Sequence, residues 1–144
     1  MFDKILYPTD FSDVSQKALD FVKRLKEAGG KDVVLLHVID ARGLDAIARY
    51  ASGDYVRIDQ KLQREVEEAM KGLENELRQV GFSVKTRIEN GIPFREILRI
   101  EKEEHVSVIV LGSHGMSNIE EMLLGSVSEK VVRKASAPVL VVKR

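Results

Sequence analysis

The stretch VSVIVLGSHGMSNIEEMLLGSVSEKVV, residues 106–132, places three glycines between an apolar run and a helical pattern. Its first seven residues, 106–112, are typical of a strand that is covered on both faces. Its last part begins a helix that we expect over residues 126–136. A buried strand, a loop with glycines and a helix, in this order, indicate an α/β fold with a parallel sheet, in which ligands bind beyond the carboxyl ends of the strands.

The rest of the chain alternates between short apolar runs and helical periodicity, as parallel strands joined by crossover helices do. We expect strands at residues 4–8, 32–40, 82–91, 106–112 and 137–143, and helices at residues 13–28, 56–80, 93–103 and 126–136. The apolar face of the first helix is predicted to comprise Val14, Ala18, Phe21, Val22 and Leu25. That of the second is predicted to comprise Leu62, Val66, Met70, Leu73, Leu77 and Val80.

Helix-capping and helix-breaking residues predict where the elements begin and end. Ser12 or Asp13 should cap the first helix, and Gly29 with Gly30 should stop it. Pro93 is well suited to the first turn of the third helix. We therefore expect an order of β-α-β-α-β-α-β-α-β.

The apolar patterns also predict where each strand lies in the sheet. Residues 32–40 are apolar without alternation, which favours an interior strand. Residues 82–91 alternate apolar and polar side chains, which suits an edge strand with one wet face. The last strand is short and apolar, with Pro138 at its start, and we expect it at the other edge, where it needs a cover or a partner.

Composition limits the class of protein. The 144 residues suit a single domain over residues 1–144, and 23 basic residues balance 23 acidic ones. A net charge of zero favours a small-molecule or protein partner over nucleic acid or an anionic membrane. The chain has no cysteine, no signal-peptide pattern and no membrane-spanning run, so a cytoplasmic location is expected.

One connection is unusually long. Residues 40–55 exceed most strand-to-helix connections, and a short helix at 44–51 is conceivable within them. A lid, an interface and a solvated insertion all fit this composition, and its role stays open.

The glycine loop has two readings. Gly112 and Gly115 can adopt positive φ and lack side chains, so backbone N–H groups there can approach an anion closely. Gly125 and Ser126 open the last helix, whose N-terminal dipole favours phosphate. A strand-to-helix turn also needs glycine for purely structural reasons, and Ser126 with Glu129 has the spacing of a capping box. The spacing alone leaves both readings open.

The pattern of Gly112, two residues, Gly115, nine residues, Gly125 and Ser126 resembles the nucleotide-binding signature of the universal stress protein family. KILYPTDFS, LLHVID, GIPFREIL, LGSVSEKVV and APVLVVK also look like that family, in order and over nearly the whole chain. The resemblance implies an open five-stranded parallel sheet of order 3-2-1-4-5 with helices on both faces. It also implies a homodimer joined through the last strand.

The resemblance further implies a site for ATP, ADP or AMP, with Mg²⁺. Asp10 and the backbone of Val38 would hold the adenine end, with Pro8 and Thr9 in the same wall, although Asp10 also suits a helix entry. The ribose and phosphates would be lined by Gly112, His114, Gly115, Gly125, Ser126 and Val127. Met116 stands where many ATP-binding relatives carry Lys or Arg, which puts the affinity for a triphosphate in doubt.

Three functions follow for testing: a nucleotide-binding regulatory module of the stress response, a slow ATP hydrolase or nucleotidyl transferase, and a dimeric interaction protein that binds no nucleotide. The chain lacks GxxxxGK[ST], GxGxxG and HExxH, which disfavours an energy-coupled NTPase, an NAD enzyme and a zinc site. No carboxylate is spaced to orient His114 as a general base, so no catalytic residue is assigned. His37 and His105 are expected to be structural. We favour the binding module.

Overall fold

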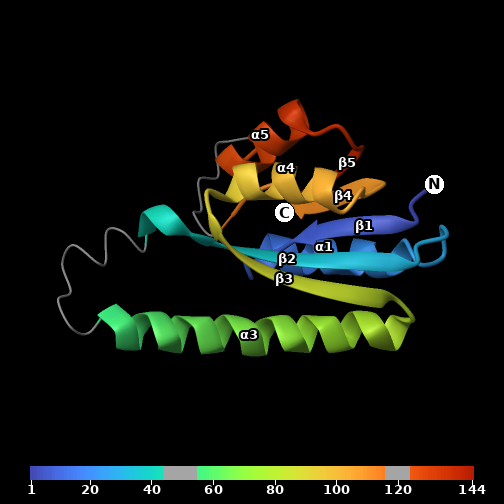
Figure 1. Cartoon of the computed structure of the whole chain (residues 1–144). Coiled ribbons are helices and arrows are strands. Elements are labelled where there is room, and N and C mark those ends of the chain that lie inside the picture. Colours follow the sequence, from blue (N-terminus) through green and yellow to red (C-terminus); the bar gives the residue numbers. More distant parts are fainter. Residues whose placement is uncertain (44–54, 116–123) are drawn as a thin grey trace.

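A computed structural model describes residues 1–43, 55–115 and 124–144 (Figure 1). The strands are β1 (Lys4–Pro8), β2 (Asp32–Asp40), β3 (Ser83–Gly91), β4 (Val108–Gly112) and β5 (Val139–Val142). The helices are α1 (Asp13–Arg24), α3 (Tyr55–Val80), α4 (Pro93–Glu103) and α5 (Ser126–Lys134). The five strands form one parallel sheet in the order β3-β2-β1-β4-β5, which confirms the expected fold class and strand order.

Helices cover both faces of the sheet, α1 and α3 on one and α4 and α5 on the other (Figure 1). Alternate side chains of β1 enter the two layers: Ile5 and Tyr7 pack with α1 and α3, and Leu6 packs with α4 and α5. All three are 0% exposed. A strand buried on both faces has no use for polar residues, which explains the unbroken apolar runs.

The ends of α1 differ in how well the sequence predicted them. Ser12 is the N-cap, and its side chain accepts a hydrogen bond from the Ser15 N–H at 3.2 Å, as expected. The helix ends at Arg24, however, and the chain continues in turns to Gly29, whose φ is +96°. The prediction that the helix continues to residue 28 and is stopped by Gly29 and Gly30 was wrong, because a glycine marks where the turns finish as readily as where a helix stops.

Two residues predicted on buried helix faces lie at the surface. Phe21 is 36% exposed, and the Arg24 guanidinium lies 5.5 Å from the centroid of the Phe21 ring. Leu19, which was not predicted on this face, is fully buried. Val80 is 37% exposed because it is the last residue of α3, beside the turn at Gly81. Helical spacing identifies the apolar stripe of a helix. It does not show which residues at the margins and ends of that stripe are covered by neighbouring elements.

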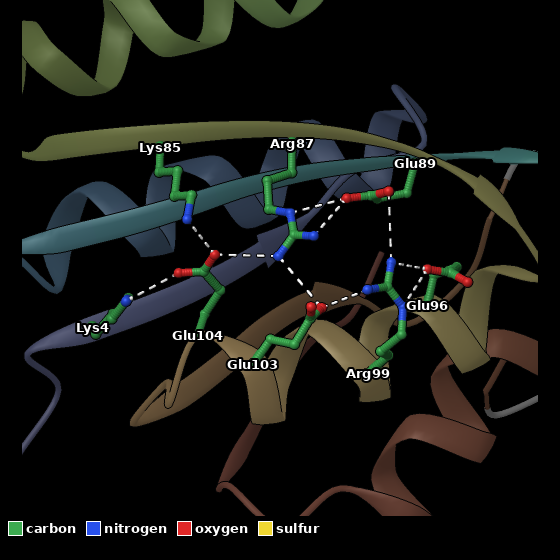
Figure 2. Close-up of polar contacts among 8 residues, drawn as sticks. All are labelled: Lys4, Lys85, Arg87, Glu89, Glu96, Arg99, Glu103 and Glu104. Atoms are coloured by element: carbon green, nitrogen blue, oxygen red, sulfur yellow. Dashed lines mark hydrogen bonds and ion pairs between the residues drawn. The ribbon is translucent and has the colours of Figure 1, made fainter.

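β3 is an edge strand, as predicted, but its polar face carries an ion-pair network rather than a bare wet surface (Figure 2). Glu104, just after α4, is its centre: one oxygen lies 2.6 Å from Lys85 Nζ and 3.2 Å from Arg87 Nη1, and the other lies 3.2 Å from Lys4 Nζ. The remaining members are Glu89, Glu96, Arg99 and Glu103. The network joins α4 to β3 and β1, so it helps to orient the helix whose other end borders the cleft described below.

Among the described residues, no helix is long and apolar enough to cross a bilayer. The predicted short helix at 44–51 lies outside the described residues, as does most of the connection 40–55. The extent of the domain and the cytoplasmic location stay predictions.

Candidate functional site

A cleft opens at the carboxyl ends of the strands, where the strand order reverses between β1 and β4. The N-terminal ends of α4 and α5 border it together with the loop after β1. Its lining comprises Pro8, Thr9, Asp10, Ser15, Leu36, Val38, Pro93, Ile97, Leu111, Gly112, His114, Gly115, Val127 and Ser128. The fold therefore brings together eight of the ten predicted site residues, leaving Gly125 and Ser126 just outside the lining.

One part of the cleft is apolar. Leu36 and Val38 come from the end of β2, Pro93 and Ile97 from the first turns of α4, and Leu111 from β4. Of these apolar residues only Val38 was predicted as a site residue. Ser15 and Ser128 of the lining were not predicted either, whereas Asp10 was. In the sequence these residues cannot be distinguished from core residues, because the apolar ends of strands and starts of helices pack the core and also line the cleft. Such a surface suits a flat, weakly polar ring.

The loop after β1 presents a carboxylate to the cleft. Asp10 Oδ1 accepts a hydrogen bond from the Ser12 N–H at 3.0 Å, so Asp10 does support the helix entry, as one reading held. The other oxygen, Oδ2, lies 2.9 Å from the position that a Cβ on Gly115 would occupy. Asp10 therefore has a structural bond through one oxygen and faces the glycine loop with the other.

Glycine is needed at position 112 because of close packing and not because of its backbone conformation. Neither Gly112 nor Gly115 has positive φ, so neither position uses the conformational freedom that glycine allows. A Cβ on Gly112 would lie 2.7 Å from Val14 Cγ1 and 3.1 Å from its carbonyl carbon. Gly112 is therefore glycine because α1 packs directly onto the end of β4.

Gly125 joins the start of α5 to the loop after β4. Its N–H donates to the Ser113 carbonyl at 2.6 Å, and a Cβ on it would lie 3.2 Å from His114 Cα. Gly125 is the N-cap of α5, without a capping side chain, and Ser126 is the first helical residue. The alternative reading of Ser126 and Glu129 as a capping box is therefore wrong, and Glu129 instead pairs with Arg133. Since glycine supplies no cap, the first-turn N–H groups are left for another acceptor.

The loop between β4 and α5 is held by local side-chain bonds. Ser128 Oγ is buried and donates to the Gly112 carbonyl at 2.6 Å. His114 Nδ1 lies 2.8 Å from Ser113 Oγ, so this ring nitrogen is engaged by its own neighbour. Among the described residues, no three His, Asp or Glu side chains are grouped to hold a metal ion.

Two titratable side chains, Tyr7 and His37, are hydrogen-bonded to backbone carbonyls of residues that line the cleft. Burial raises the pKa of Tyr7 to about 12, and its hydroxyl donates to the Ser15 carbonyl at 2.5 Å. Burial lowers the pKa of His37, although the bond to the Thr9 carbonyl opposes this shift. Both groups are therefore neutral at pH 7.

The fold and the cleft define an open parallel α/β protein in which a helix start without a side-chain cap lies beside an apolar wall. The family model described as the universal stress protein family matches residues 1–143. The chain is 42% identical to universal stress protein MJ0577 of Methanocaldococcus jannaschii, over 100% of this chain and 96% of that protein. This chain belongs to the universal stress protein family.

Solved structures agree on the fold. The structure of protein MJ0577 matches with a TM-score of 0.89 and 45% identity, over 100% of this chain and 97% of the other. A universal stress protein in complex with cAMP matches with a TM-score of 0.70 and 21% identity, over 99% and 97% of the two chains. An Arabidopsis thaliana family member with AMP bound matches with a TM-score of 0.65 and 22% identity, over 99% and 92%. At such identities the last two share the fold with this chain.

Proposed function

We propose that this protein binds an adenine nucleotide, ATP, ADP or AMP, in the cleft between β1, β4 and the starts of α4 and α5. It would act as a nucleotide-dependent regulatory module of the stress response. In this arrangement the adenine lies against the apolar wall near Val38, and the phosphates lie at the glycine loop and the start of α5.

The observation that carries the proposal is the uncapped start of α5 beside Gly115 and Asp10. Gly125 leaves the first-turn N–H groups without a side-chain acceptor, and these groups with the helix dipole favour an anion. Asp10 Oδ2, on the other side of Gly115, is an acceptor for hydroxyl or amino donors. A ligand with an anionic end, hydroxyl groups and a flat apolar ring matches these three features, and a nucleotide has all of them.

Mg²⁺ is part of the proposal because it commonly accompanies nucleotide phosphates, whose oxygens, with water, would supply most of its ligands. Two proteins of the same fold bind adenine nucleotides, cAMP in one and AMP in the other. They support the choice of base, although the argument for this chain rests on its own cleft.

Calorimetry of the native protein with ATP, ADP and AMP, each with and without Mg²⁺, tests the proposal. We expect saturable one-to-one binding of at least one of the three, with GTP as the control for the base. Nucleotide released from the purified, denatured protein and identified by mass spectrometry shows which one is bound in the cell. Absence of binding at millimolar nucleotide would assign the chain to a branch that binds none and contradict the proposal.

We further propose that the protein is a homodimer joined along β5. β5 is an edge strand whose one strand neighbour is β4, and Leu140 is 37% exposed. Edge strands of this kind pair readily with another chain. A second copy is the simplest partner because it brings the same edge.

A further inference from the structure

His37 contacts both neighbours of Asp10 in the chain. Its Nδ1 lies 2.7 Å from the Thr9 carbonyl oxygen, and its ring stacks on the Phe11 ring with 4.5 Å between centroids and 27° between planes. The carbonyl can only accept, so Nδ1 carries the proton and donates it. One side chain from β2 thus holds the two residues that flank the carboxylate.

The held loop is conformationally strained. Phe11 has a φ of +65°, in the left-handed region that is unfavourable for a residue with a side chain. Such a conformation persists where the surroundings impose it. The Phe11 N–H donates to Thr9 Oγ1 at 3.1 Å, and the stacked imidazole lies against its ring. The strain is local to the residue directly after Asp10, so the contacts that impose it also set the direction of the carboxylate.

The carboxylate direction matters for the cleft. The same loop conformation places Asp10 Oδ1 at the Ser12 N–H and Oδ2 beside Gly115. If the loop relaxed to an ordinary backbone conformation, the Asp10 side chain would leave one or both of these positions. His37 itself is outside the set of residues that line the cleft, so we expect it to act on the site through the residues that it contacts.

We infer that His37 is a positioning residue for the nucleotide site, and that it acts on the ligand through Asp10. This inference rests on the proposed function for its link to nucleotide. The link from His37 to Asp10 is a property of the loop and can be measured without a ligand. Burial lowers the pKa of His37, so the ring stays neutral at pH 7 and keeps its protonated Nδ1 towards Thr9.

The ligand-free test is amide hydrogen exchange at Ser12, whose N–H donates to Asp10 Oδ1. In His37→Leu, which loses the donor and the stacked imidazole, we expect exchange at Ser12 to speed up at least fivefold relative to amides in the middle of β2. His37→Asn places an amide donor near the position of Nδ1, and we expect it to restore much of the protection. The control His105→Asn changes the histidine after α4, which is also at positive φ, and should leave Ser12 unaffected. Unchanged exchange in His37→Leu would overturn the inference whether or not nucleotide binds.

The ligand test is a double-mutant cycle with Asp10→Ala, measured as the dissociation constant for AMP. We expect His37→Leu to weaken binding about tenfold in the native background and less than twofold when Asp10 is already alanine. Independent structural damage would give equal factors in both backgrounds, which would contradict action through Asp10. If the native protein binds no adenine nucleotide, the proposed function fails, and the exchange result alone decides whether His37 holds the loop.

Discussion

The carboxylate of Asp10 and the backbone of Gly115 lie so close that a single methyl group does not fit between them. Oδ2 is 2.9 Å from the Cβ position of Gly115, although residue 10 follows β1 and residue 115 follows β4. The two loops belong to the strands between which the sheet reverses its order. The glycine therefore sets how closely the two walls of the cleft approach.

Gly115→Ala is predicted to weaken adenine nucleotide binding at least tenfold, about 1.4 kcal/mol, because the new Cβ displaces the Asp10 carboxylate and intrudes beside the phosphates. The displaced group is the end of a side chain, so the fold should survive. Titration calorimetry with AMP and ATP measures the change. Gly72→Ala is the matched control: a Cβ there meets nothing within 4 Å, and the change should raise stability by about 0.5–1 kcal/mol without altering affinity. Native affinity in Gly115→Ala would contradict the close approach as a feature of the site.

Glu104 is predicted to make the free energy of unfolding decrease as the pH becomes acidic. The Lys85 ammonium is the main cause that lowers its pKa from 4.5 to about 2, with Lys4 contributing. A carboxyl whose pKa is lower in the folded state contributes stability above pH 4.5 and loses it as the pH falls towards 2. We expect this contribution to be roughly 2 kcal/mol, because the largely exposed Lys85 weakens the pair through solvent screening.

Urea unfolding of the native protein and Glu104→Gln at pH 7, 4, 3 and 2 measures this contribution. The two stabilities should differ by about that amount at pH 7 and converge near pH 2. The control Glu68→Gln replaces an exposed carboxylate of α3 and should follow the native curve. A constant difference between native protein and Glu104→Gln across this range would show that the loss is not electrostatic.

Edge pairing of β5 is predicted to depend on the outward backbone groups of Val141. The carbonyls of Pro138 and Val142 accept from Ile109 and Ser113 on the β4 side, so by alternation the N–H of Val141 points to the open edge. Val141→Pro removes that donor while leaving the bonds to β4 intact. We expect light scattering to show a dimer for the native protein and a monomer for the variant.

Phe21→Lys is the control for that experiment, because it places a charge at an exposed apolar residue of α1 and leaves the backbone of β5 unchanged. It should remain dimeric. A native monomer, or a Val141→Pro protein that is still dimeric, would exclude the β5 arrangement.

Hydrolysis of bound ATP is predicted to be well below the median enzyme rate of about 10 s⁻¹. Phosphoryl transfer needs a positioned water and charge neutralisation on the γ-phosphate, and His114 Nδ1 is engaged by Ser113 Oγ at 2.8 Å. Phosphate release under saturating Mg-ATP should be slow and should persist in His114→Ala. Met116→Lys, which restores a cation at a position outside the described residues, should raise affinity for ATP more than for AMP. A native turnover of several per second that collapses in His114→Ala would make His114 catalytic.

The sequence by itself determined the elements and their order. Apolar runs marked the buried strands, alternation marked β3 as an edge, and Pro93 marked the start of α4. These signals are local, because propensity and periodicity act over a few residues to a few turns. The candidate site was predicted in the same way, as loops after strands, with the strand order and the individual residues taken from a family resemblance. That is why Pro8, Asp10 and Gly115 were anticipated, whereas Leu36 and Ile97 passed for ordinary core.

The tertiary structure alone decided which distant residues meet. Lys4 and Ser107 are 103 positions apart, yet the Lys4 N–H donates to Ser107 Oγ at 2.9 Å because β1 and β4 are neighbours. Gly112 is glycine because of Val14, and the direction of Asp10 depends on His37, 27 positions later in the chain. Contacts of this kind depend on the shape of the assembled layers, in which each side chain fills space left by others far along the chain. No periodicity within one element encodes that shape, so the strand pairing, the close approaches and the held loop appear only in the folded chain.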